Sequence, residues 1–190
     1  KLGSITIAEA MRRAGIKPEA VEECYMGSVL TGALGQAPAR QAWLGAEGVE
    51  STPCTTVGKV CGSGLQSVIL GARGMMLGES DVMVAGGAEA AVCRLGIAGF
   101  SASRALSTKF NDTPERASRA FDADRDGFVI GGGGAIVVLE ALEHAQARGA
   151  KIYAEIVGGG STADAHHITS PHPDGLGAML AMKQAIEEAG

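Results

Sequence analysis

The sequence predicts an α/β fold with a mostly parallel sheet and helices on both of its faces. Short apolar runs of strand length alternate with longer segments in which apolar residues recur every three or four positions. The run 81–85 is apolar almost throughout, as expected of a strand that helices cover on both faces. Glycine clusters separate these segments and indicate tight turns.

The first part of the chain follows this alternation closely. An apolar stripe stops at Gly15, a residue typical of the position just after a helix. In chain order, the pattern predicts a helix over 2–14, a strand over 22–30, a helix over 38–46, a strand over 53–60, a helix from 65 to about 77 and the strand over 81–85.

The pattern changes near Gly86, where glycines and polar residues become more frequent. The remaining chain predicts a short helix over 95–106, polar loops up to 126, one or two strands within 128–140, a helix over 140–148, a strand over 151–157 and a helix over 175–189. Both ends of the chain run directly into or out of a helix. We therefore expect this sequence to be part of a longer fold.

Composition excludes several classes of function. The chain has 190 residues and a formal net charge of −5, which argues against a nucleic-acid or anionic-membrane surface. The four cysteines have no CxxC spacing and no histidine at a zinc-ligand distance, so we expect free thiols and no metal. No signal peptide or membrane span is recognisable. These features favour the cytoplasm, with the mitochondrial matrix as the alternative.

Cys61 is the first candidate catalytic residue, because it stands between an expected strand and the following helix. Free N–H groups and the helix dipole favour negative charge at such a position, and the thiolate is the nucleophilic form of cysteine. Gly62 and Gly64 leave room for a substrate carbonyl to reach those N–H groups as an oxyanion hole. The alternative is a buried cysteine that acts as a small apolar side chain.

The segment 122–127 offers a calcium-binding alternative. Its acidic residues at Asp122, Asp124 and Asp126, followed by Gly127, match the first half of an EF-hand loop. The twelfth position of that loop is Gly133, where a bidentate glutamate is required. The match is therefore incomplete, although a calcium-binding module remains a rival class of function.

Two other motifs have simpler interpretations. The glycines at 131–134 lack the Lys-Ser/Thr pair of a phosphate loop, so we interpret them as a strand pressed close to another backbone. His166 and His167 are adjacent and point in different directions, so they are poorly placed to chelate one metal. One of them could serve as a general base or a hydrogen-bond donor, and a surface or packed histidine is the alternative.

Two families resemble different parts of the chain, and the likeness changes at Gly86–Gly87. Residues 1–87 resemble the N-terminal part of thiolases of the acetoacetyl-CoA type, in the pieces 25–30, 34–41, 59–64 and 84–87. Residues 86–190 resemble β-ketoacyl-acyl-carrier-protein synthases of the elongating type, in the pieces 86–90, 95–100, 104–107, 125–129 and 164–169. Both families belong to the thiolase superfamily, so the chain looks like a chimera or a fragment.

The resemblance implies a fold and a set of site residues. It implies the thiolase-like αβαβα layers, with the N-terminal half over 1–150 and the beginning of the C-terminal half over 151–190. Cys61 would be the acyl-accepting nucleophile, and His167 would match the first active-site histidine of the synthases. The other residues that either reaction needs lie in the rest of the C-terminal half. The chain departs from the thiolase pattern at Ser28 and Gly58, where asparagine is usual.

The implied function is acyl transfer between thioesters. An acyl group from coenzyme A or acyl carrier protein would form an acyl-Cys61 intermediate, and a Claisen condensation would then form a carbon–carbon bond, as in fatty acid biosynthesis. Thiolase chemistry is the second candidate, and a catalytically incomplete structural module is the third. The resemblance implies a homodimer, thioester substrates and no further cofactor.

Overall fold

The computed structural model describes residues 1–190, which divide into two compact units, Lys1–Glu140 and Ala141–Gly190. Each unit is described by itself. The boundary that the resemblance places at residue 150, between the two halves of a larger fold, is a different division and stays a prediction. None of the helices combines the length and the apolar character that crossing a membrane requires.

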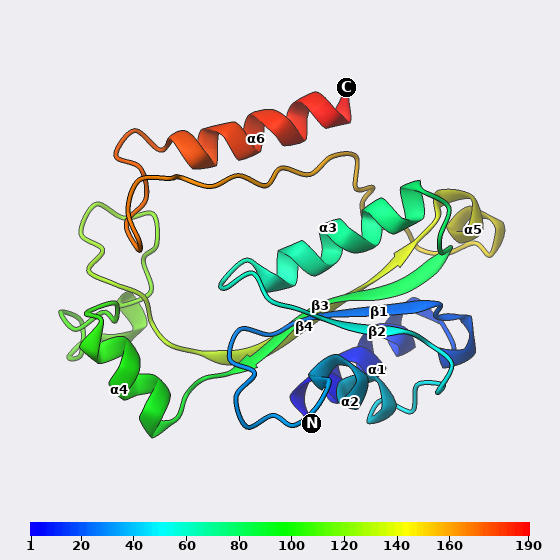
Figure 1. Ribbon diagram of the computed structural model, residues 1–190, viewed down its shortest axis with the longest axis horizontal. Helices are drawn as coiled ribbons and strands as arrows, with labels where there is room; N and C mark the ends of the chain where they lie inside the picture. Colours follow the sequence, from blue (N-terminus) through cyan, green and yellow to red (C-terminus); the bar gives the residue numbers. More distant parts are fainter. The chain divides into compact units, whose positions relative to one another are not determined.

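The first unit contains the sheet and most of the helices (Figure 1). Its elements in chain order are α1 (Leu2–Ala14), β1 (Glu23–Gly27), α2 (Pro38–Leu44), β2 (Cys54–Val57), α3 (Ser63–Met76), β3 (Val82–Ala90), α4 (Arg94–Ala102) and β4 (Gly132–Glu140). Two single 3₁₀ turns, Pro18–Ala20 and Pro114–Arg116, complete it. The expected order of helices and strands is confirmed throughout this unit.

The sheet is mostly parallel, as predicted, with strand order β2-β1-β3-β4. β1 pairs in parallel with β2 and β3, whereas β4 runs antiparallel to β3 along all nine residues of each strand. β3 continues to Ala90, five residues beyond the apolar run, because its second half finds a full set of backbone partners in β4. The glycines at 132–134 are part of that pairing, so their interpretation as a strand is confirmed.

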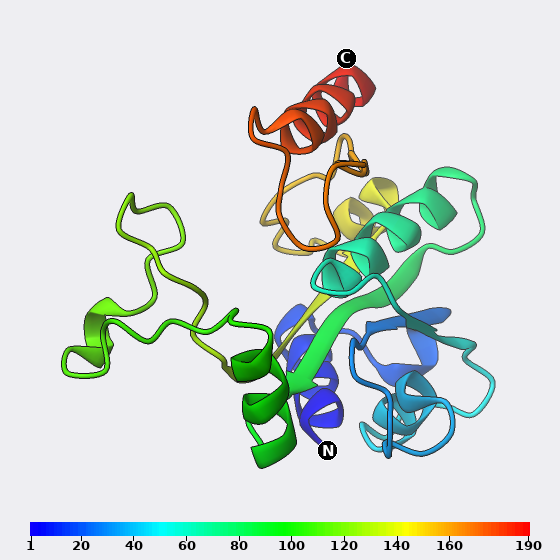
Figure 2. The same ribbon diagram turned by 60° about the vertical axis from the view of Figure 1, so that its left-hand side comes forward.

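Helices cover both faces of the sheet, with α1 and α2 on one face and α3 on the other (Figure 2). The core on the α1 and α2 side includes Ile7, Trp43 and Val84, each with no exposed surface. The smaller core under α3 is centred on Met83. β3 contributes to both cores, which explains why its first half is apolar on both faces.

The loop between α4 and β4 is held together by Asp126. Its carboxylate accepts hydrogen bonds from the Ser107 hydroxyl (2.6 Å) and from the backbone N–H groups of Thr108 and Lys109 (2.8 Å each). These bonds, led by the one from Ser107, lower the pKa of Asp126 to about 2. No group of three or more acidic, histidine or cysteine side chains is placed to hold a metal ion. The third acid of the EF-hand-like segment therefore has a structural partner within the loop.

The second unit contains α5 (Leu142–Ala147) and α6 (Leu176–Ala189). The strand predicted over 151–157 is wrong, because this segment pairs with no other strand. Beyond it, the chain bonds to side chains of α6: Gly159 N–H donates to Glu188 (2.9 Å), and Ser161 N–H donates to Gln184 (3.1 Å). The β-branched composition alone did not reveal that a partner strand was missing.

Candidate active site

Cys61 lies on the turn between β2 and α3, immediately before Gly62, the N-cap of the helix. Its side chain is exposed, so the alternative of a buried cysteine that acts as a small apolar side chain is wrong for this residue. Val60, the residue before it, has φ 49°, a left-handed conformation that a β-branched residue rarely adopts. Such strain, worth about 1–3 kcal/mol, is often found at functional sites. The turn therefore exposes the thiol to solvent, and it does so with a strained backbone at Val60.

The hydroxyl of Ser63 fixes the shape of this turn. It accepts a hydrogen bond from Lys59 N–H (2.7 Å) and donates one to the carbonyl oxygen of Val60 (2.6 Å). The side chain is buried, so water does not compete for these bonds. Sequence reasoning missed Ser63, because its bonds to Lys59 and Val60 depend on the shape of the folded turn.

The oxyanion hole expected at the start of α3 is not formed by the first two N–H groups after Cys61. Gly62 N–H donates to Lys59 O, and Ser63 N–H donates to Val60 O, each at 3.1 Å. Both donors are already used within the turn, so neither is free to bind a substrate oxygen. Of the two glycines that follow the cysteine, Gly64 has a packing role instead.

Three glycines bring the turn close to the sheet. Gly27 at the end of β1 pairs with Gly87 on β3, and Gly64 in α3 lies against both strands. A Cβ on Gly27 would lie 2.5 Å from the backbone N of Gly64, and one on Gly87 would lie 3.2 Å from the Cα of Gly64. Because these contacts are between backbones, only glycine permits them. They place Cys61 at the carboxyl end of β1.

A cavity of about 590 Å³ contains Cys61. Its walls are the end of β1, the first turn of α3, the glycine-rich middle of β3 and the facing part of β4. Apart from Cys61, Ser28, Ser63 and Glu89, the lining residues are glycine or apolar. Such a surface suits an apolar chain next to a reactive thiol.

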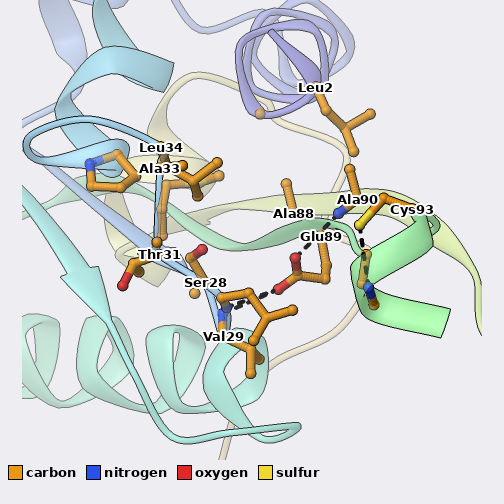
Figure 3. Close-up of a pocket in the computed structure, with 18 of the residues that line it drawn as sticks. Leu2, Ser28, Val29, Thr31, Ala33, Leu34, Ala88, Glu89, Ala90 and Cys93 are labelled. Atoms are coloured by element: carbon orange, nitrogen blue, oxygen red, sulfur yellow. Dashed lines mark hydrogen bonds between the residues drawn. The ribbon is translucent and has the colours of Figure 1, made fainter. Parts of the chain in front are cut away.

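A larger cavity of about 1340 Å³ adjoins the first but does not contain Cys61 (Figure 3). It is lined by the loop 28–34, the start of α1, the end of β3 and part of α4. Gly27, Ser28, Val29, Ala88 and Glu89 line both cavities. We assign the chemistry to the smaller cavity, because it holds the nucleophile.

Glu89 holds the wall between the two cavities. Its carboxylate accepts hydrogen bonds from the N–H groups of Val29 (3.2 Å) and Leu30 (3.4 Å), as Figure 3 shows. These are two consecutive amides of the loop after β1. Glu89 and that loop are distant in the sequence, so no local pattern indicated the contact.

His167 lies in an exposed loop of the second unit. Its Nδ1 accepts hydrogen bonds from the backbone N–H groups of Thr169 (3.2 Å) and Ser170 (3.1 Å). An accepting Nδ1 leaves the proton of the neutral ring on Nε2, which is then a hydrogen-bond donor. Of the two roles that the sequence left open, this arrangement favours donation over general base catalysis.

Asp164 ties the same loop to α6. Its Oδ1 accepts a hydrogen bond from Gly177 N–H (3.2 Å), in the first turn of that helix. Thr162 donates its hydroxyl to Gly177 O (2.6 Å), so both backbone polar groups of Gly177 are held. His166 instead packs against the ring of His172, with the ring centroids 5.2 Å apart. Cys61 and His167 belong to different units, and their pairing in one site stays a prediction.

Comparisons with known proteins agree with these features. The family model described as "Thiolase, N-terminal domain" matches residues 1–94. A 3-oxoacyl-[acyl-carrier-protein] synthase 2 of Rhizobium meliloti is 55% identical over 138 residues, which cover 73% of this chain and 33% of that protein. A mitochondrial 3-oxoacyl-[acyl-carrier-protein] synthase of Arabidopsis thaliana is 57% identical over 130 residues, covering 68% of this chain and 28% of its own length.

The match with the synthases is longer than the whole of residues 86–190. It therefore includes residues before Gly86 and overlaps the thiolase-like part of the chain. The chain spans about a third of the length of these curated relatives.

A solved structure extends the likeness to the fold. It is described as a type II polyketide synthase acyl-carrier protein in complex with its ketosynthase, bound to the hexaketide. The match has a TM-score of 0.79 and 26% identity, and it covers 98% of this chain and 54% of that chain. The family model, the curated relatives and the solved structure all point to the same superfamily. The chain belongs to the thiolase superfamily.

Proposed function

We propose that this chain carries the acyl-accepting part of a β-ketoacyl-acyl-carrier-protein synthase. The observation that carries the proposal is the exposed Cys61 on a strained turn, inside a cavity with mostly glycine and apolar walls. The identity of 50–57% to synthases supports this assignment. The whole reaction belongs to a longer protein, since the chain spans about a third of those relatives.

In the first step, the Cys61 thiolate attacks the carbonyl carbon of an acyl thioester. A bond forms between sulfur and the acyl carbon, and the thiolate of coenzyme A or acyl carrier protein leaves with the electron pair. The apolar acyl chain would occupy the smaller cavity and extend toward the larger one across their common wall. The product is an acyl-Cys61 thioester.

In the second step, a malonyl thioester loses carbon dioxide and becomes an enolate. The enolate carbon attacks the acyl carbon, and Cys61 leaves as a thiolate. We assign to the Nε2–H of His167 a hydrogen bond to the enolate oxygen, because the Nδ1 contacts leave the proton there. The proposed partner is an acyl carrier protein, in a homodimeric enzyme that uses no cofactor beyond its thioester substrates.

Acylation is tested by mass spectrometry of the chain after incubation with acetyl-CoA. We expect one acetyl group on Cys61 and none in the Cys61→Ala variant. Cys93→Ala is the matched control, because Cys93 is also exposed and lies outside the cavity that contains Cys61. That variant should be labelled as fully as the unchanged chain. An unlabelled Cys61 in folded protein would instead support the structural-module alternative.

The role of His167 is tested by the release of carbon dioxide from a malonyl thioester in the longer protein that contains this chain, after acylation of Cys61. His167→Gln is expected to reduce this release by about 100-fold or more, because a hydrogen bond to the enolate is lost. Acylation of Cys61 should be unchanged in that variant. His172→Gln serves as the control, and equal release by both variants would refute the assignment.

Thiolase chemistry is the second candidate, favoured by the family model that matches residues 1–94. Here a second acetyl-CoA would be deprotonated and would attack acetyl-Cys61. Acetoacetyl-CoA would then form from acetyl-CoA alone, without carbon dioxide. Supplying acetyl-CoA with and without a malonyl thioester separates the two reactions.

A further inference from the structure

Two cysteines face each other across the parallel strands β1 and β2. Cys24 and Cys54 are direct partners in the strand register. Neighbouring strands lie about 4.8 Å apart, and disulfides join Cα atoms about 4.4–6.8 Å apart. Directly paired residues of parallel strands point to the same face, and both cysteines pack against the core beneath α1 and α2. The two sulfur atoms are therefore close enough to react with each other.

The two thiols differ in their access to solvent. Cys24 is 1% exposed on an inner strand, whereas Cys54 is only partly buried. Cys54 also lies on β2, which forms the outer edge of the sheet. A small reagent can therefore reach Cys54 first, and Cys24 is held directly behind it.

A fixed cation lies beside Cys54. Arg40, on α2, donates hydrogen bonds to the backbone carbonyls of Thr52 (2.8 Å) and Glu50 (2.7 Å). These bonds hold the guanidinium against the start of β2, and the Cys54 thiol donates to the same Thr52 carbonyl oxygen (3.4 Å). Arg40 and the Cys24 thiol are the charged or titratable groups that bear on this sulfur.

The surroundings give the two thiols different roles: Cys54 is the nucleophile, and Cys24 is the resolving thiol. The neighbouring Cys24 thiol, followed by the Arg40 guanidinium, lowers the pKa of Cys54 to about 7. The same contact with Cys54, followed by burial, raises the pKa of Cys24. Cys54 is thus the more acidic of the two thiols, and Cys24 is the one that keeps its proton. Reactive redox cysteines have this combination of partial exposure, a nearby cation and a second thiol.

We propose that Cys54 and Cys24 form an oxidisable pair that reacts with hydroperoxides. The Cys54 thiolate attacks one oxygen of the peroxide, the O–O bond breaks, and hydroxide or an alkoxide leaves, so that Cys54 becomes a sulfenic acid. The Cys24 sulfur then attacks the Cys54 sulfur, the S–O bond breaks, and water leaves. Two thiols are oxidised to one disulfide while the peroxide is reduced. The pair lies apart from Cys61, and this chemistry is separate from acyl transfer.

The first test treats the folded chain with hydrogen peroxide, blocks the remaining thiols with an alkylating reagent and maps the peptides without reduction. We expect a peptide that links Cys24 to Cys54, lighter than the two free peptides by two hydrogen atoms and released by dithiothreitol. In Cys24→Ala, a sulfenic-acid probe such as dimedone should label Cys54. The Cys93→Ala control should form the same link. Oxidation confined to Cys61 and Cys93 would overturn the proposal.

The second test measures the rate at which iodoacetamide alkylates Cys54 in the unchanged chain, and so does not depend on any variant folding. The rate is expected to be half-maximal near pH 7, where half of the Cys54 thiol is ionised. Arg40→Gln should slow this rate at pH 7 by about 5-fold. Arg73→Gln on α3 is the matched control and should have no effect. A half-maximal rate at pH 8.5 or above would contradict the assignment of Cys54 as the nucleophile.

Discussion

Replacing Trp43 by alanine is expected to lower the free energy of unfolding by about 3–5 kcal/mol. The indole has no exposed surface, packs in the core beneath α1 and α2, and donates its N–H to Val49 O (2.8 Å). The substitution removes the largest fully buried side chain and leaves that carbonyl without its partner. Urea denaturation followed by circular dichroism measures the loss.

Leu44→Ala is the matched control for this prediction. Leu44 follows Trp43 in α2, but its side chain is 41% exposed. Its truncation should cost less than about 1 kcal/mol, since alanine is also a good helix former. Similar losses in both variants would mean that the core does not depend on the indole.

Gly27→Ala is expected to destabilise the chain by about 1–3 kcal/mol and to reduce acetyl labelling of Cys61. The added Cβ would lie 2.5 Å from the backbone N of Gly64 and from the carbonyl carbon of Ser63. Both are backbone atoms of α3, so rotating a side chain cannot relieve the overlap. The start of α3 must move away from β1, and Cys61 moves with it.

Gly58→Ala is the control, because it lies on the same connection as Cys61 and has no atom within 4 Å of its Cβ position. It should change stability by less than about 0.5 kcal/mol. Urea denaturation and mass spectrometry of the acetylated protein report on the two expected effects. Full labelling in Gly27→Ala would show that the position of Cys61 does not depend on this contact.

The sequence predicted the elements that depend on local periodicity. The helices α1 and α3 and the first half of β3 show their apolar pattern within a few turns or residues. The same pattern placed Cys61 between a strand and the start of α3, and the likeness to known families added only its expected role as the acyl-accepting nucleophile. The segment 151–157 has the composition of a strand, but a strand also needs a partner, and that requirement cannot be read from the segment itself.

The candidate site depends on contacts that sequence reasoning could not find. Glu89 bonds to a loop about 60 residues earlier in the chain, and only the pairing of β1 with β3 brings the two together. Cys24 and Cys54 were interpreted as ordinary free thiols, because their facing positions follow from strand register. The exposure of Cys61 and the left-handed backbone of Val60 are likewise properties of the folded turn.

The contact among Gly27, Gly64 and Gly87 also bears on how such a sequence tolerates the exchange of whole segments between related families. At Gly87, the atoms that limit the space are backbone atoms of β1 and α3. A backbone contact is the same whichever side chains surround it, so segments before and after this point can come from different ancestors without repacking the contact. The thiolase-like and synthase-like parts of the chain meet at a contact that depends on three glycines and not on the side chains around them.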